Sequence, residues 1–311
     1  MTRSIICVLF LLTTATFAQQ PTPARPKITG IDHVAFYTTS AESNERFYMT
    51  VLGLVSSRVP APIDSSQVQR FVVGSQWIGY SLGPAAQTNN RMDHVAFATE
   101  NCAELRAFLA KKGVKVPPEI SSSKYGFRNF SVSDPEGNKI EFVEHTRPSK
   151  EVLEMHVGGE GDPVSHRLIH TGFIVHDRAA EDLFYKDILG FHLYWFGGMK
   201  PDRTDWVAMQ VPDGTDWLEY MLNQPNNPDL HLTGVMNHIS LGVKDMKAAQ
   251  AKLESHGWKP HGDEHSQMGK DGKWQLNLFD PDQTRVELME FTPAEKPCCS
   301  EFQGPHPTEP N

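Results

Sequence analysis

One local pattern occurs four times along the chain: a short apolar strand that carries a histidine, then a helix, a turn and a closing strand. The histidines of this pattern are His33, His94, His170 and His238. Three of the closing strands carry a glutamate at the matching place, and these are Glu141, Glu219 and Glu287. A repeat that keeps metal-capable side chains at both of its ends predicts metal sites built between repeats.

The segments between these strands predict one repeated module. A helix follows each first strand: Asp177 and Asp245 stand where two of these helices begin, and Gly53 stands where another one ends. Turn residues such as Asp134 and Pro135 then lead into the closing strand, and the remaining length leaves room for one further strand. Each repeat is therefore predicted to be a βαβββ module, and the chain to have an α+β fold.

The four modules group into two pairs. The first and third modules, at about 31–82 and 168–222, share an FY…LG helix, whereas the second and fourth, at about 92–145 and 235–291, share an Asp-Pro turn. The true unit is therefore a pair of modules, present twice. We expect each pair to form a half-barrel, a cup-shaped sheet with its helices on the outside.

Composition places a boundary between the two pairs. Residues 146–167 are rich in Gly and Pro and form the best linker candidate. The predicted organisation is a signal peptide at 1–18, a Pro-rich leader at 19–30, a first two-module domain at 31–145, the linker, a second two-module domain at 168–293 and a disordered tail at 294–311. Within this tail, Cys298 and Cys299 could alternatively form a disulfide with each other or contact a metal together with His306.

The beginning of the chain has the three parts of a secretory signal peptide. Arg3 provides a basic start, residues 5–12 an apolar core, and residues 16–18 a cleavage site before Gln19. The apolar run is too short to cross a bilayer as a helix. We therefore expect a periplasmic or secreted protein with no stable membrane span after cleavage; an uncleaved anchor is the alternative.

The charge of the chain limits its partners. The formal net charge is -9, and such a balance argues against nucleic acid, whose phosphates require clustered Lys and Arg. A small-molecule substrate is the expected partner. Because four modules can close two cups within one chain, a monomer is sufficient, and a homodimer is not excluded.

Strand periodicity explains how the histidines and glutamates could meet. Side chains alternate across a strand, so Glu287 and Met289 share one face of the last strand, while Val286 and Leu288 point to the other face. If the concave face is the one that carries His and Glu, paired modules bring both residue types into one cup. Two imidazoles with one or two carboxylates suit Fe(II), Mn(II), Ni(II), Zn(II) or Co(II), with positions left for substrate.

The two halves offer different ligand sets. The second half offers His170, Glu219, His238 and Glu287, and the first half offers His33, His94 and Glu141, with Gly79 at the fourth position. These sets assume that module one pairs with two and module three with four. Pairing module one with four would instead combine His33, His238 and Glu287.

The DHVAF strands, the FYxxxLG helices and the DPEGNKIEFVE ending resemble the vicinal oxygen chelate superfamily, which includes glyoxalase I, bleomycin-resistance proteins and extradiol dioxygenases. The resemblance covers about 31–291. It implies metal ligands at the first-strand histidines and the last-strand glutamates. It also implies that the second-half set is similar to that of bacterial glyoxalase I, and the first-half set to an extradiol iron site.

Three functions remain open from the sequence. The leading hypothesis is an exported metalloenzyme that binds adjacent substrate oxygens for a lyase, isomerase or epimerase step, with Glu219 or Glu287 as general base. The second is an Fe(II)- or Mn(II)-dependent ring-cleaving dioxygenase that uses the first-half triad. The third is a metal-free binding protein of the bleomycin-resistance type, with an aromatic lining formed by Trp77, Tyr80, Trp195, Phe196, Trp206 and Trp217.

Overall fold

The computed structural model describes residues 24–57, 68–83, 88–123, 126–147, 161–200, 202–262 and 264–310 of the 311-residue chain. The predicted signal peptide at 1–18 lies outside the described residues, as does most of the predicted linker. In the part of the chain that is described, no helix is long and apolar enough to cross a membrane.

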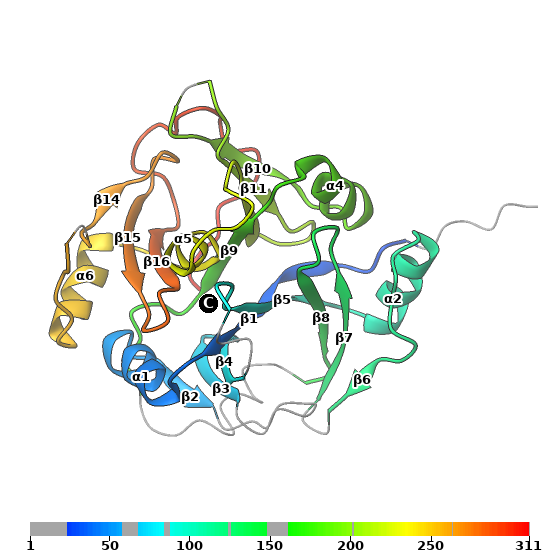
Figure 1. Ribbon diagram of the computed structural model, residues 1–311, viewed down its shortest axis with the longest axis horizontal. Coiled ribbons are helices and arrows are strands. Elements are labelled where there is room, and N and C mark those ends of the chain that lie inside the picture. The colour runs from blue at the N-terminus through cyan, green and yellow to red at the C-terminus, as the bar shows by residue number, and fades with distance from the viewer. Residues whose placement is uncertain are drawn as a thin grey trace, which may run out of the picture.

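Two eight-stranded sheets lie side by side (Figure 1). The first has the order β2-β3-β4-β1-β5-β8-β7-β6 and consists of β1 (Ile28–Thr38), β2 (Val55–Ser57), β3 (Val68–Val73), β4 (Gln76–Leu82), β5 (Met92–Thr99), β6 (Ser121–Ser122), β7 (Phe127–Ser133) and β8 (Lys139–His145). The second has the equivalent order β10-β11-β12-β9-β13-β16-β15-β14 and consists of β9 (Leu168–Ile174), β10 (His192–Gly197), β11 (Trp206–Gln210), β12 (Trp217–Met221), β13 (His238–Val243), β14 (Gln267–Met268), β15 (Trp274–Phe279) and β16 (Arg285–Glu290).

Strand pairing confirms the predicted modules and the way they combine. In every module the first strand runs parallel to the last strand, as β1 does to β4 and β13 does to β16. Antiparallel pairing of β1 with β5 joins the first two modules, and antiparallel pairing of β9 with β13 joins the other two. The histidine strands therefore occupy the middle of each sheet, next to the strands that end each module.

Four of the described helices follow the first strands of the modules, as the sequence predicts, and a fifth, at Leu230–Met236, is not among those predicted. These helices are α1 (Ala41–Glu45), α2 (Cys102–Lys111), α4 (Arg178–Asp182), α5 (Leu230–Met236) and α6 (Met246–Ser255). The predicted caps are confirmed for α4 and α6, whose first turns donate backbone N–H groups to the side chains of Asp177 and Asp245. Gly53 follows the first helix with a φ of 69°, a conformation that favours glycine. The FY…LG helices differ from expectation because each continues as a π-helical turn, at Arg46–Val51 and Leu183–Ile188.

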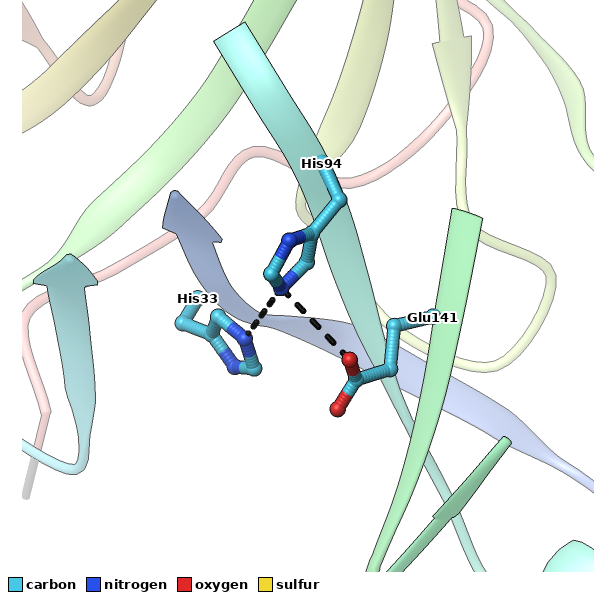
Figure 2. Close-up of side chains that lie close together, drawn as sticks. All are labelled: His33, His94 and Glu141. Carbon is cyan, nitrogen blue, oxygen red and sulfur yellow. Dashed lines mark hydrogen bonds and ion pairs between the residues drawn. The ribbon is translucent and has the colours of Figure 1, made fainter. Parts of the chain in front are cut away.

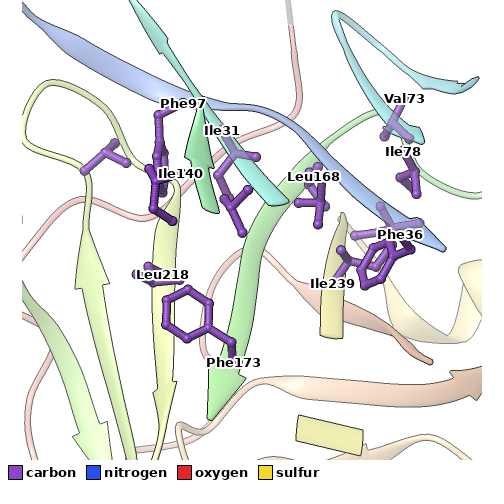
Figure 3. Close-up of a cluster of buried hydrophobic side chains, with 14 of the residues drawn as sticks. Ile31, Phe36, Val73, Ile78, Phe97, Ile140, Leu168, Phe173, Leu218 and Ile239 are labelled. Atoms are coloured by element: carbon purple, nitrogen blue, oxygen red, sulfur yellow. The ribbon is translucent and has the colours of Figure 1, made fainter. Parts of the chain in front are cut away.

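The apolar faces of the two sheets contribute to one core (Figure 3). Ile140, which precedes the glutamate of β8, is fully buried in this cluster, as is Val286 before the glutamate of β16. The predicted alternation is therefore present, with apolar residues on one face and the site residues on the other. Phe97 of the first half meets Phe191 of the second edge to face, with ring centroids 5.2 Å apart, so the core is shared between the halves.

Buried carboxyl groups also connect the halves. The hydroxyl of Tyr80 donates to Asp280 at 2.6 Å, and the hydroxyl of Thr38 donates to Asp282 at 2.5 Å, each across the boundary between the halves. The same arrangement occurs with the roles reversed where Tyr185 donates to Asp134 at 3.1 Å. Whether the predicted domains at 31–145 and 168–293 fold separately stays a prediction.

The prediction of a disordered tail is wrong for residues 294–310, which lie against the second sheet. Backbone hydrogen bonds hold this segment, among them Ala294 N–H to Gly272 O at 2.8 Å and Gln303 N–H to Tyr194 O at 2.9 Å. Phe302 packs against an aromatic cluster of the second sheet. Periodicity could not predict this order because the segment is held by irregular contacts with β10 and with the turn before β15, and it forms no helix or strand of its own.

Candidate metal centres

The first candidate centre lies in the cup of the first sheet. His33 comes from β1, His94 from β5 and Glu141 from β8, and their side chains converge (Figure 2). The Nε2 atoms of the two histidines are 2.9 Å apart, and Nε2 of His94 is 3.5 Å from Oε2 of Glu141. One ligand atom from each residue lies within 4.8 Å of the others, so the structure brings together the whole set predicted for this half.

Carboxylates orient both imidazoles of the first centre. Nδ1 of His33 lies 2.6 Å from Asp32, and Nδ1 of His94 lies 2.6 Å from Asp93. Asp32 also bonds Nε2 of His145. A carboxylate that accepts from Nδ1–H fixes the ring orientation and makes the other nitrogen a better ligand, as in carboxylate–histidine–metal groups. The sequence carried this signal, because each acid directly precedes its histidine, but the sequence analysis did not use it.

The donor set of the first centre fits a divalent ion. Both Nδ1 atoms lie at hydrogen-bonding distance from carboxylates, and the two Nε2 atoms face one another across 2.9 Å, so a divalent ion could be bound by both Nε2 atoms. Two nitrogens bound at right angles to an ion with Zn-like bond lengths would be about 3.0 Å apart. Burial lowers the pKa of His33, which favours the neutral imidazole that a metal requires. Despite burial, the partners His145 and His33 hold the pKa of Asp32 below its ordinary value.

An indole ring occupies the place of a fourth ligand in the first half. A Cβ atom at Gly79 would come within 2.6 Å of the Trp77 ring. That ring stacks on His33 with centroids 3.7 Å apart, and the guanidinium of Arg70 lies 4.5 Å from the indole centroid. The first centre therefore remains a two-histidine, one-carboxylate set.

The second candidate centre has four residues in the equivalent cup. His170 comes from β9, Glu219 from β12, His238 from β13 and Glu287 from β16. The Nε2 atoms of the two histidines are 3.1 Å apart. Oε2 of Glu219 lies 3.4 Å from His238 and 3.9 Å from His170, so these three residues form one group within 4.8 Å. Oε2 of Glu287 lies 3.2 Å from Nε2 of His170, although Glu287 is not part of that group.

In the second centre, unlike in the first, no carboxylate among the described residues binds the Nδ1 atom of either histidine. Nδ1 of His238 lies 2.8 Å from the carbonyl oxygen of Met236, whereas Nδ1 of His170 is buried without a hydrogen-bond partner among the described residues. Burial lowers the pKa of His238 to about 4. Despite burial, a hydrogen bond from His170 and the nearby Arg285 hold the pKa of Glu287 at about 2. A neutral imidazole at His238 beside the ionised Glu287 is the form that binds a divalent cation.

A cavity of about 350 Å³ opens beside the second centre, and both Glu219 and Glu287 line it. Its other walls are aromatic and polar, and they include Tyr194, Trp195, Trp206, Trp217, Asn277, Arg285 and Phe302. Trp195, Trp206 and Trp217 agree with the predicted aromatic lining, but Trp77, Tyr80 and Phe196 do not line this cavity. Arg285 and Phe302 are residues that the sequence analysis missed.

The structure thus consists of duplicated βαβββ modules that present histidines and glutamates in a cup. A family model described as the Glyoxalase/Bleomycin resistance protein/Dioxygenase superfamily matches residues 30–142 and 167–288, which is more than half of the chain. The chain therefore belongs to this superfamily, as the resemblance implied.

Solved structures of similar fold include dioxygenases. The 2,3-dioxygenase LapB from Pseudomonas sp. KL28 has a TM-score of 0.61 and 15% identity, covering 92% of this chain and 96% of that one. Homoprotocatechuate 2,3-dioxygenase from Brevibacterium fuscum, in complex with 3,4-dihydroxyphenylacetate, has a TM-score of 0.58 and 16% identity, covering 87% and 83%. At this level of identity the likeness establishes the fold.

One curated relative is similar in sequence. It is 4-hydroxyphenylpyruvate dioxygenase from Yarrowia lipolytica, 22% identical over 216 residues. The match covers 58% of this chain and 54% of that protein, so the chain spans about half the length of this relative.

Proposed function

We propose that this protein is an exported, divalent-metal-dependent enzyme that binds a small substrate through two adjacent oxygens at the second centre. The observation that carries the proposal is the convergence of His170, His238 and Glu219 on one point at the wall of a 350 Å³ cavity, with Glu287 beside them. An ion bound there would act as a Lewis acid that stabilises negative charge on the substrate oxygens.

The residues of the second centre have separate tasks in this proposal. Glu219 and the two histidines hold the ion. Glu287 lies outside that group, is ionised at neutral pH and lines the cavity, so it can accept a proton from a carbon next to a substrate carbonyl. Arg285 lies on the same wall and can bind an oxygen of the substrate. This favours a lyase, isomerase or epimerase step.

Two variants test the second centre. Glu287→Gln should abolish turnover while the metal content falls little, because the amide cannot accept the proton. His238→Ala should lose both turnover and metal. Elemental analysis of the purified protein and proton exchange of α-hydroxy carbonyl compounds in D₂O are the measurements. Full activity in both variants would reject the proposal, and the absence of metal from both halves would favour the metal-free binding function.

A ring-cleaving dioxygenase is the second candidate, and two observations favour it. The first centre is a two-histidine, one-carboxylate set, the type typical of non-haem Fe(II) oxygenases, and carboxylates support both of its imidazoles. The similar proteins named above are dioxygenases. Oxygen consumption with catechols in protein loaded with Fe(II) tests this function. It should disappear in His94→Ala and persist in His238→Ala if the first centre is responsible.

The proposal of export rests on residues 1–18. Expression with the complete N-terminus in a Gram-negative host should yield a periplasmic protein whose mass corresponds to a chain that begins at Gln19. A cytoplasmic product that retains Met1 would contradict export without affecting the proposal for the metal centre.

A further inference from the structure

The C-terminal segment forms part of the wall of the second-half cavity. Phe302 lines the cavity, and its ring centroid is 4.8 Å from that of Tyr194. Beyond it, Nδ1 of His306 lies 2.5 Å from the hydroxyl oxygen of Tyr194. This segment, drawn in red in Figure 1, lies outside the residues matched by the family model.

The neighbouring residues Cys298 and Cys299, which precede Phe302 in this segment, form a disulfide. Cys298 N–H donates to the carbonyl of Lys270 at 2.8 Å, and the indole N–H of Trp195 donates to the carbonyl of Cys298 at 3.2 Å. Lys270 and Trp195 both line the cavity. The disulfide therefore lies where the segment is attached to the rim of the site.

The next residues extend this attachment toward Phe302. The hydroxyl of Ser300 accepts from Phe196 N–H at 2.9 Å and lies 3.0 Å from the Phe196 carbonyl oxygen, to which it donates. Cys299 adopts a φ of 74°, a left-handed conformation that a residue with a side chain rarely takes. The bridge to Cys298 restricts this backbone, so the direction in which the chain leaves toward Phe302 depends on the bridge.

We propose that the Cys298–Cys299 disulfide is a redox-active site that locks residues 298–306 over the second-half cavity, and that its reduction releases them. In the oxidised protein Phe302 closes one wall of the cavity. In the reduced protein Cys299 can leave the left-handed region, and the bonds made by Ser300, Gln303, Pro305 and His306 are then lost, which frees Phe302. The value of this lock for catalysis rests on the proposed function, because it presumes that the second cavity is the active site.

The chemistry requires a dithiol or a small thiol as the reductant. A thiolate attacks the sulfur of Cys299, which is exposed, and the S–S bond breaks to leave the Cys298 thiolate and a mixed disulfide. A second thiol group resolves the mixed disulfide. The two cysteine sulfurs thereby take up two electrons and two protons, and the reductant becomes a disulfide. Among the described residues, the remaining cysteine is Cys102, which is buried and free; burial raises its pKa to about 12, so it does not take part.

Proteolysis after Glu301 measures the release directly. Glu301 is exposed next to Phe302, so a glutamate-specific protease should cut there slowly while the segment is held and at least tenfold faster once it is released. The full-length mature protein is digested with and without dithiothreitol, and the appearance of the fragment that begins at Phe302 is followed by mass spectrometry. Cleavage after Glu119, an exposed position remote from the disulfide in sequence, provides the internal control and should not change.

Two variants separate the lock from a general effect of the reductant. Cys298→Ser combined with Cys299→Ser should be cut rapidly with or without dithiothreitol, whereas Cys102→Ser should respond as the unaltered protein does. Acrylamide quenching of tryptophan fluorescence should rise in the same samples that are cut rapidly. Equal cleavage of oxidised and reduced protein would overturn the lock, as would a response to dithiothreitol in the double serine variant. If that variant does not fold, the comparison of oxidised with reduced unaltered protein decides. None of these measurements requires enzymatic activity, so failure of the proposed function leaves them readable.

Discussion

Removal of the carboxylate behind His94 should weaken metal binding at the first centre by a defined amount. Asp93 holds Nδ1 of His94 at 2.6 Å, accepts from the hydroxyl of Tyr37 at 2.6 Å and lies 3.5 Å from Nζ of Lys139. Loss of an outer carboxylate of this type lowers metal affinity by roughly 10–100-fold. This corresponds to about 1.4–2.7 kcal/mol. Because the Asp93 side chain is 23% exposed and water can replace part of its role, we expect the lower half of this range.

The assay requires a protein with one active centre. Combining His170→Ala with His238→Ala silences the second half, and Zn²⁺ affinity is then measured by competition with a chromophoric chelator. Asp93→Ala should weaken binding by about tenfold or more. Asp93→Asn should weaken it less, because the amide oxygen still accepts the hydrogen bond but carries no charge. Tyr37→Phe leaves the carboxylate in place and provides the matched control, with an expected change of under threefold.

An unchanged affinity in Asp93→Ala would refute the reasoning. It would mean that the ion does not bind through His94, or that the ring keeps its orientation without the carboxylate. A loss of affinity in Tyr37→Phe as large as in Asp93→Ala would indicate a packing effect instead. Circular dichroism of each variant establishes that the fold is retained.

Three further outcomes follow from the fold. Burial raises the pKa of Glu181 to about 8 from an ordinary value of 4.5, so the folded protein binds this proton more tightly than the unfolded chain does. The free energy of unfolding should therefore fall as the pH rises from about 5 to 8, and Glu181→Gln should raise Tm at pH 8 but not at pH 5. Identical pH profiles of Tm for the variant and the unaltered protein would contradict the reasoning. Phe97→Ala should lower the free energy of unfolding in urea by about 3–5 kcal/mol. Both halves should unfold in one transition, because the Phe97 ring packs on Phe191 of the other half, and two separate transitions would contradict a shared core. Gly79→Glu should destabilise the fold through its clash with Trp77 and should not strengthen Zn²⁺ binding at the first centre; tighter binding would show that the indole can move aside.

The parts of the structure that follow from local rules could be predicted from the sequence. The alternation around Glu287 fixed which face of its strand would carry the site, and the aspartates before two helices fixed where those helices begin. Module pairing was left open, because strand pairing depends on contacts between residues far apart in the chain. The antiparallel pairing of β1 with β5 settles it.

Other features depend on tertiary contacts that periodicity does not encode. The side chain of Trp77 fills the space beside Gly79, so the loss of the fourth carboxylate was visible in the sequence but its replacement was not. Phe302 reaches the cavity from a segment without regular structure. Its position follows from hydrogen bonds to Lys270 and Tyr194, which no local pattern in the Pro-rich tail could reveal.

The hydrogen bond of Asp280 to the other half limits which changes of the sequence the protein can tolerate. Asp280 is buried in the second half and accepts a hydrogen bond from the hydroxyl group of Tyr80 in the first half. A chain shortened to either half would lose this hydrogen bond and would expose to water the apolar residues that the two halves share in one core. Deletion of one half is therefore expected to destabilise the other, and new activities are expected to arise by substitution within one cup while the other half remains as its structural support.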